Sequence, residues 1–219
     1  AQLERTAELA AAEAARPVSP NVVWEGLNIP RETREEAQGH GAAVVWFTGL
    51  SGSGKTTIAR ALERQLFHDG VRTMLLDGDY VRHGLNGDLG FSPEDRRENV
   101  RRVGEVARLF FEAGSVVLCT FVSPYRADRD RVRSLIPEGR FVEVFVDVDL
   151  EVARARDPKG LYARSQAGDL EGLTGVDAPY QAPVAPEVTV ETRDVTVEES
   201  VESLRRALVE AGVVPGGSR

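Results

Sequence analysis

The sequence predicts an α/β fold in which a parallel β-sheet is covered by helices on both faces. From residue 41 onward, short apolar segments alternate with segments whose apolar residues recur at helical spacing. The apolar segments are nearly continuous, which is typical of strands that are buried on both faces. A glycine-rich turn joins the first of these segments to the first helix. Strand–helix alternation of this kind builds a parallel sheet, because each helix returns the chain to the same edge.

The first elements surround the glycine-rich turn. Ala43–Thr48 (AVVWFT) is apolar enough for a fully buried strand, and Lys55–His68 carries apolar residues three and four positions apart, as in a helix. A second strand is expected over Val71–Leu76.

A long helix should follow, with Ser92 as its cap and Pro93 at its first position. A serine side chain can accept from a free amide of the first turn, and proline has no amide to satisfy there. The helix should end near Ala113. Two further strands are expected over Val116–Val122 and Phe141–Val146, each followed by a helix-like segment.

A last strand, Val188–Glu191, leads to a helix capped by Thr196 and ended by Gly212. Before residue 41, the pattern predicts a short Ala- and Glu-rich helix over 1–16 and a polar, irregular arm over 17–40. We therefore expect an N-terminal extension or linker (1–20), one domain (21–214) and a C-terminal tail (215–219).

Composition narrows the class of protein. The 219 residues are 42% hydrophobic and 28% charged, as in a globular domain, and no apolar run is long enough for a membrane span. The net charge of −8 argues against nucleic acid as a partner. No secretory signal is apparent, and the single cysteine, Cys119, fits a reducing cytoplasm.

The glycine-rich turn fits the phosphate-binding pattern G-x-x-x-x-G-K-[ST] without a mismatch. Its glycines let backbone amides turn toward phosphate oxygens, Lys55 would reach the β- and γ-phosphates, and the Thr56 hydroxyl would ligate Mg²⁺. A GTPase is not favoured, because neither lysine follows an asparagine as a guanine-selective N-K-x-D segment requires. The predicted ATP-binding residues are Gly49, Leu50, Ser51, Gly52, Ser53, Gly54, Lys55, Thr56 and Thr57.

Acidic residues follow the second predicted strand, in the segment Asp77-Gly78-Asp79. Ligands collect at the carboxyl ends of parallel strands, where a carboxylate can orient or deprotonate an attacking hydroxyl. We favour Asp79 as such a catalytic group, although the same segment also suits a simple turn.

Further along, Arg82, Phe91, Arg96 and Asn99 form a candidate acceptor site. Arg96 and Asn99 are three apart on the long helix and share a face. Each alone could be a solvated surface residue, but together they suggest an anionic acceptor.

The segment 157–176 carries glycines, Lys159 and Arg164, with Arg156 just before it, and is predicted to be a mobile lid that excludes water. An ordinary surface loop remains the alternative. Ser123 follows a strand, but no histidine lies near it in sequence to activate it.

Taken together, these residues resemble the adenylylsulfate kinase (APS kinase) family. The resemblance spans about residues 21–190 and rests on the segments GHGAAVVWFTGLSGSGKTT, LDGD, VRHGLN, DLGFSPEDRRENVRRVGEVARLF, FVSPYRADR, RDPKGLYARSQAG and LTGVDAPYQAP. It implies a P-loop nucleoside-triphosphate kinase fold and the ATP- and Mg²⁺-dependent phosphorylation of adenosine 5′-phosphosulfate in sulfate assimilation.

The resemblance also implies roles for single residues. Asp79 would assist the acceptor 3′-hydroxyl, Phe91 would stack on the acceptor adenine, and Ser123 matches a position described as a phosphoserine intermediate. We expect direct transfer instead, because in-line phosphoryl transfer needs no covalent step. The implied substrate-binding residues are Asp79, Arg82, Phe91, Arg96, Asn99, Lys159 and Leu173.

The chain departs from the family at Leu173, where Phe is usual, at Gln166, where Arg is frequent, and at Tyr80, where Asn is frequent. These departures concern acceptor affinity and the lid. The family further implies a homodimer, and fusion or association with ATP sulfurylase.

Two alternatives stay open at this stage. One is a different small-molecule P-loop kinase. The other is a non-catalytic nucleotide-binding module, which the Leu173 departure would suggest.

Overall fold

In the computed structural model of the chain, residues 21 and 27–216 are described. The chain divides into two units, Ala1–Pro30 and Arg31–Arg219, and the second holds the described secondary structure. The predicted helix over 1–16 lies outside the described residues. No helix of the described part is both long and apolar enough to cross a membrane.

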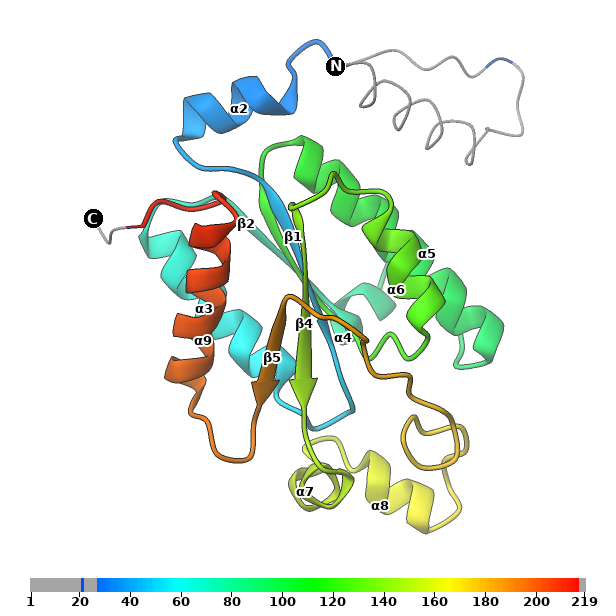
Figure 1. Ribbon diagram of the computed structural model, residues 1–219. Coiled ribbons are helices and arrows are strands. Elements are labelled where there is room, and N and C mark those ends of the chain that lie inside the picture. The colour runs from blue at the N-terminus through cyan, green and yellow to red at the C-terminus, as the bar shows by residue number, and fades with distance from the viewer. Residues whose placement is uncertain (1–20, 22–26, 217–219) are drawn as a thin grey trace. The chain divides into compact units, whose positions relative to one another are not determined.

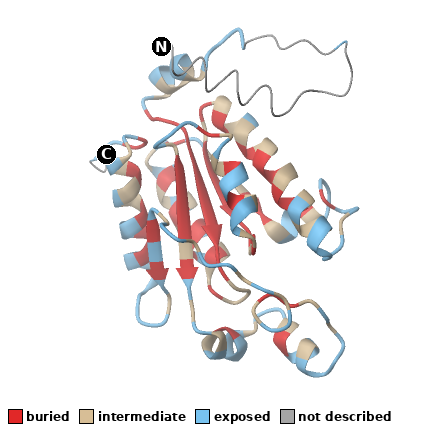
Figure 2. Cartoon of the chain, turned by 45° about the vertical axis from the view of Figure 1, so that its right-hand side comes forward, coloured by how far each residue is buried: buried red, intermediate tan, exposed pale blue. Residues whose placement is uncertain are grey.

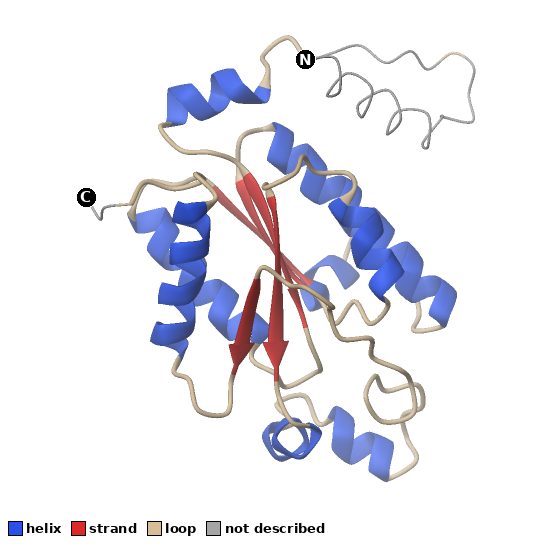
Figure 3. Cartoon of the chain, in the orientation of Figure 1, coloured by secondary structure: helices blue, strands red, loops and turns tan. Residues whose placement is uncertain are grey.

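The five strands form one parallel sheet in the order β2-β3-β1-β4-β5 (Figures 1 and 3). The prediction of a parallel sheet is therefore confirmed. The strands are β1 (Ala43–Thr48), β2 (Thr73–Asp77), β3 (Val116–Thr120), β4 (Phe141–Asp147) and β5 (Val188–Glu191).

Strand periodicity divides the core into two layers. Val45 and Phe47 of β1 pack with α3 and α9, whereas Val44 and Trp46 point to the opposite face and pack with α5 and α6. Strands β1 and β3 are buried throughout, whereas the edge strands β2 and β5 are only partly buried (Figure 2). The covering helices are α3 (Lys55–His68), α9 (Val197–Glu210), α5 (Pro93–Glu112) and α6 (Arg126–Arg133).

The caps expected from sequence are present. The Ser92 side chain accepts from the Asp95 amide at the start of α5, and Thr196 forms a reciprocal capping box with Glu199 at the start of α9. The helix ends are thus set locally, as predicted.

Three expectations were wrong. The arm over 17–40 is not irregular throughout, because Arg31–Gln38 forms helix α2. The strand predicted over Val71–Leu76 begins two residues later and includes Asp77. The strand predicted over Val116–Val122 stops at Thr120.

The segment predicted to be a lid contains structure of its own. It contains helix α8 (Leu161–Gln166), and helix α7 (Leu150–Arg156) comes just before it. Both helices lie beyond the carboxyl ends of the strands (Figure 1). Tyr162, Leu173 and Ala153 form a small separate hydrophobic cluster there. We refer to 157–186, which is the predicted lid (157–176) together with the chain that leads on toward β5, as the lid segment. The short helix α4 (Gly78–Arg82), between β2 and α5, was not predicted.

Candidate active site

One cavity of about 930 Å³ opens at the carboxyl ends of the strands. Its walls come from the phosphate loop, the segment after β2, the first half of α5, the segment after β3 and the lid segment. Of the residues predicted from sequence, Gly49 and Leu50 are not part of its lining. The cavity brings together Ser51, Gly52, Ser53, Gly54, Lys55, Thr56, Thr57, Asp79, Arg82, Phe91, Arg96, Asn99, Ser123, Lys159 and Leu173.

The phosphate loop requires glycine for reasons of space as well as conformation. At Gly49 a Cβ atom would lie 2.4 Å from the Val146 carbonyl oxygen of β4. Gly54 is left-handed, with φ 102°, and leads directly into α3 without a side-chain cap. The first amides of α3 are therefore available to an anion in the cavity.

Lys55 is buried at the first position of α3. Its Nζ donates to the carbonyl oxygens of Gly49 (2.9 Å) and Leu50 (2.7 Å) and to the Ser53 hydroxyl (3.3 Å). Burial, and then repulsion from Lys159, lower the pKa of Lys55 to about 7. A triphosphate in the loop would supply the negative charge that holds this ammonium protonated.

Asp77, which sequence reasoning passed over in favour of Asp79, is the buried acid of the site. Its carboxylate accepts from the hydroxyls of Thr56 and Thr120, both at 2.8 Å, and from the Asp79 amide at 3.0 Å. Burial raises its pKa, but hydrogen bonds from Thr120 and Thr56 outweigh that effect and hold the pKa below its usual value. Its place at the end of β2 was the available sequence indication.

The pair of Thr56 and Asp77 suits Mg²⁺. Both side chains offer oxygen, the ligand that Mg²⁺ prefers. The Thr56 hydroxyl at the start of α3 donates to the Asp77 carboxylate at the end of β2, so the two oxygens are adjacent. The described residues include no group of three or more acidic, histidine or cysteine side chains that could hold a metal. Two protein oxygens fit a Mg²⁺ ion that takes its other ligands from phosphates and water.

Asp79 and Lys159 meet across the cavity. Asp79 projects from α4, Lys159 belongs to the lid segment, and the two form an exposed ion pair. The structure thus brings together two residues that are eighty positions apart and that were each predicted for the site.

Phe91 lies next to two arginines in the wall of the cavity. The Arg82 guanidinium is 4.2 Å from the ring centre, and the Arg96 guanidinium is 5.7 Å from it. Arg96 also donates to Gly172 O (2.6 Å) and Thr174 Oγ1 (2.9 Å) of the lid segment. The arginines and the aromatic ring form one surface that suits a planar, anionic molecule.

Asn99 is oriented by a second asparagine that sequence reasoning missed. The Nδ2 of Asn86 donates to Asn99 Oδ1 at 3.0 Å, and both side chains are buried. The Asn99 oxygen is thereby occupied, so its amide nitrogen is left as a donor for the cavity. No motif spacing links the two, because Asn86 lies in the turns after α4.

Leu173 is buried in the hydrophobic cluster of the lid segment, next to residues that contact the phosphate loop. Tyr162 of the same cluster donates its hydroxyl to Ser51 O at 2.9 Å. Arg156, at the end of α7, donates to the carbonyl oxygen (2.6 Å) and hydroxyl (3.0 Å) of Thr192 after β5. Arg164 also lines the cavity.

Ser123 has the geometry of a structural residue. It is buried, its φ is 39°, and it is the only non-glycine residue of the described part with a left-handed backbone. Its hydroxyl accepts from Trp46 Nε1 at 3.1 Å and lies 3.5 Å from Phe121 O, to which it donates. No histidine or carboxylate contacts this hydroxyl among the hydrogen bonds of the described residues, so no base activates it there.

The cavity holds a phosphate loop and, beside Thr56 of that loop, the buried acid Asp77. Its lining also includes arginines and an aromatic ring that suit a small anionic molecule. This combination is typical of a small-molecule kinase with the P-loop fold. A family model for adenylylsulphate kinase matches residues 41–191. The chain belongs to the adenylylsulfate kinase family.

Individual relatives agree. The chain is 50% identical to the adenylyl-sulfate kinase of Staphylococcus carnosus over 196 residues, which are 90% of this chain and 98% of that protein. The Mycobacterium tuberculosis APS kinase CysC, solved in complex with AMPPNP and APS, superposes with a TM-score of 0.73 at 43% identity, covering 78% of this chain and 98% of that one. A hexameric APS kinase from Thiobacillus denitrificans superposes with a TM-score of 0.62 at 33% identity, covering 83% of this chain and 30% of that one.

Proposed function

We propose that the chain transfers the γ-phosphoryl group of ATP to the 3′-hydroxyl of adenosine 5′-phosphosulfate, giving ADP and 3′-phosphoadenosine 5′-phosphosulfate. The acceptor oxygen forms a bond to phosphorus while the bond from phosphorus to the bridging oxygen of ADP breaks. The proton of the hydroxyl passes to a base, for which Asp79 is the candidate. The observation that carries this proposal is the single cavity shared by the phosphate loop and the wall of Arg82, Phe91 and Arg96.

On the donor side, the amides of residues 49–57 would hold the phosphates, and Lys55 would neutralise charge on the transferred group. The Thr56 hydroxyl and the Asp77 carboxylate would hold Mg²⁺. Bound there, Mg²⁺ would supply electrostatic stabilisation of the phosphate oxygens.

On the acceptor side, Arg82, Arg96 and Asn99 would hold the phosphosulfate and ribose, while Phe91 would stack on adenine. Asp79 would orient the 3′-hydroxyl or take its proton. Lys159 would bind the phosphates when the lid segment closes over the cavity, and Leu173 would form part of the cavity wall. The contacts of Ser123 support a role in holding the wall rather than a phosphoserine step.

The test is an acceptor panel with a coupled readout of ADP. Adenosine 5′-phosphosulfate should be used, whereas nucleoside monophosphates and gluconate should not. Turnover of one of those acceptors in place of adenosine 5′-phosphosulfate would indicate a different small-molecule kinase. Calorimetric binding of both nucleotides without any product would indicate a non-catalytic module.

Variants test the residue assignments. Lys55→Ala and Asp79→Ala should each reduce kcat by about 10²- to 10³-fold, as expected when one transition-state contact is lost. Circular dichroism should show an intact fold in both. Normal turnover of the Asp79 variant would remove that carboxylate from the mechanism.

Assembly and location remain predictions. The homodimer and the association with ATP sulfurylase implied by the resemblance, and a cytoplasmic location, each need their own measurement. Light scattering after size exclusion would distinguish a dimer from the hexamer described for the Thiobacillus relative.

A further inference from the structure

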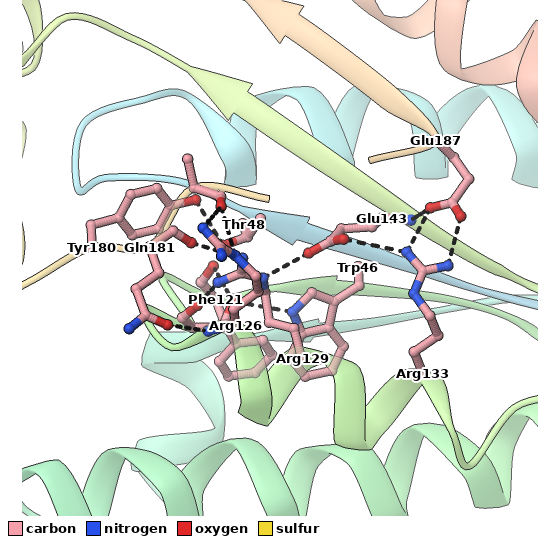
Figure 4. A network of polar contacts seen from close by, with 12 residues as sticks. Trp46, Thr48, Phe121, Arg126, Arg129, Arg133, Glu143, Tyr180, Gln181 and Glu187 are labelled. Carbon is pink, nitrogen blue, oxygen red and sulfur yellow. Dashed lines mark hydrogen bonds and ion pairs between the residues drawn. The ribbon is translucent and has the colours of Figure 1, made fainter. Parts of the chain in front are cut away.

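A buried ion pair lies beside the cavity but outside its lining. Arg129 of α6 and Glu143 of β4 are both buried, and Arg129 Nε donates to Glu143 Oε1 at 2.6 Å (Figure 4). A guanidinium in such a place is stable only when its other N–H groups also find acceptors. Where those acceptors lie indicates what the pair is for.

The remaining donors of Arg129 reach two segments that are distant in sequence. Nη1 donates to the carbonyl oxygen of Ser123, and Nη2 donates to that of Gln181, both at 2.8 Å. Ser123 belongs to the cavity wall after β3, and Gln181 belongs to the lid segment shortly before β5. One side chain therefore joins the wall, the lid segment and the central sheet.

Other bonds close the same junction. The Gln181 amide donates to Pro124 O at 2.8 Å, and its side-chain oxygen accepts from the Arg126 amide at 2.9 Å. Tyr180 next to it shares a hydrogen bond with Thr48 at the end of β1 (3.0 Å; Figure 4). The Tyr180 ring also stacks on Phe145 of β4. This end of the lid segment is fixed to the sheet, whereas Lys159 at the other end is held only by an exposed ion pair.

The wall that Arg129 holds lies on the acceptor side. Ser123 and Pro124 follow β3, which is the neighbour of β2 in the sheet, and β2 leads to Asp79 and Arg82. The carbonyl that Arg129 binds belongs to the one left-handed non-glycine residue of the described chain. Such a backbone persists only when its surroundings hold it in place.

We propose that Arg129, paired with Glu143, is a positioning residue for the phosphoryl acceptor, and this rests on the proposed function. It holds the strained wall at Ser123 and the fixed end of the lid segment in one arrangement, so that the acceptor hydroxyl meets the donor phosphate. Neither residue lines the cavity, so each would act through the wall and not by contact with a substrate.

The experiment separates positioning from stability. Arg129→Met combined with Glu143→Leu removes both charges together, and replacing a buried ion pair by apolar side chains often leaves stability unchanged. The acceptor KM should rise and kcat should fall, with kcat/KM for adenosine 5′-phosphosulfate reduced about 10- to 100-fold. The KM for ATP should stay within about twofold, because Arg129 makes no contact with the phosphate loop among its hydrogen bonds.

A milder variant covers the case in which the double variant does not fold. Arg129→Lys keeps a cation beside Glu143, but one ammonium lacks the planar fork that reaches Ser123 and Gln181 together. Its kcat/KM for adenosine 5′-phosphosulfate should also fall, but by less than in the double variant, and its KM for ATP should again stay within about twofold of wild type.

The matched control is Arg133→Gln. Arg133 lies on the same helix and pairs with Glu143 and with Glu187, but it makes no hydrogen bond to Ser123 or Gln181 (Figure 4). Its acceptor KM and kcat should match wild type even if its melting temperature falls. An unchanged acceptor kcat/KM in the folded Arg129 variants, or an equal loss in Arg133→Gln, would overturn the positioning role. A wild-type protein without activity on adenosine 5′-phosphosulfate would instead overturn the proposed function.

Discussion

At the residue scale, the site pairs one buried ammonium with one buried carboxylate. Lys55 donates to carbonyl oxygens of its own loop, and its pKa is lowered to about 7 by burial. Asp77 is held ionised by two threonine hydroxyls. The site therefore combines a carboxylate that stays negative with a buried cation, and a phosphate that arrives beside Lys55 would stabilise that cation.

The lowered pKa of Lys55 predicts a dependence of stability on pH in the absence of nucleotide. Between the folded pKa of about 7 and an unfolded value of about 10.4, the unfolded chain binds more protons, so this residue makes the free energy of unfolding rise with pH. Lys55→Met should remove that rise and should stabilise the protein more at pH 7 than at pH 9. Urea unfolding of the wild type and of Lys55→Met at pH 7 and at pH 9 gives the four free energies of unfolding that are compared. Parallel pH curves for the two would contradict the assignment.

The pair of Asn86 and Asn99 makes a second residue-scale prediction. Asn86→Leu removes the donor that orients the Asn99 amide, and so the acceptor KM should rise about fivefold to tenfold. Stability should change little, because two costs offset each other: leucine removes the Asn86 oxygen, which is buried without a hydrogen-bond partner, but leaves Asn99 Oδ1 without its donor. Steady-state kinetics with adenosine 5′-phosphosulfate and with ATP should show the change for the acceptor alone. A rise in both KM values would point to a general distortion.

At the scale of elements, the lid segment contacts each wall of the site through a different residue. Tyr162 reaches the phosphate loop, Gly172 and Thr174 accept from Arg96, and Lys159 pairs with Asp79. Its small hydrophobic cluster is separate from the two layers of the main core. Because this cluster is separate from the main core, we predict that the part of the lid segment around Lys159 moves during the catalytic cycle while the end at Gln181 stays fixed.

The lid lysine can be tested against a neighbouring ion pair of the same region. Lys159→Met should lower kcat about 10²-fold while leaving the melting temperature unchanged, because exposed ion pairs contribute little to stability. Arg154→Met, which breaks the exposed pair with Glu151 on α7, is the control and should keep wild-type kcat. Equal kcat values in the two variants would show that Lys159 has no part in turnover.

At the scale of the whole molecule, the phosphate loop depends on the layer that carries α3. Leu62 of this helix is fully buried in the cluster formed by β1, α3 and α9, whereas Phe67 of the same helix is 71% exposed. Loss of packing under α3 should therefore act on stability before it acts on chemistry.

Two alanine substitutions on α3 test this. Leu62→Ala should destabilise the fold by about 2–5 kcal/mol, and each kcal/mol should lower the melting temperature by about 2–4 °C. Phe67→Ala should stay within about 0.5 kcal/mol of wild type. Thermal denaturation gives both values, and kcat at 20 °C should remain close to wild type in each. A similar loss in the two variants would mean that this layer is not the source of stability.

The amino-acid sequence alone determined the features that depend on neighbours along the chain. The glycines at 49, 52 and 54 allow the positive φ angles of the phosphate loop. Ser92 and Thr196 cap the helices that they precede, and the continuous apolar segments form buried parallel strands. The parallel sheet and the phosphate loop could be predicted for this reason, whereas the family was identified from the resemblance of whole segments to its members.

Tertiary structure alone decided which residues meet. Asp77 rather than Asp79 lies against Thr56, Asn86 orients Asn99, and Arg129 joins two segments more than fifty positions apart. Helix α2 was missed because its polar sequence carries no buried residue to give it an apolar stripe. Contacts of this kind depend on strand order and on the return path of the lid segment, and no local spacing in the sequence encodes either.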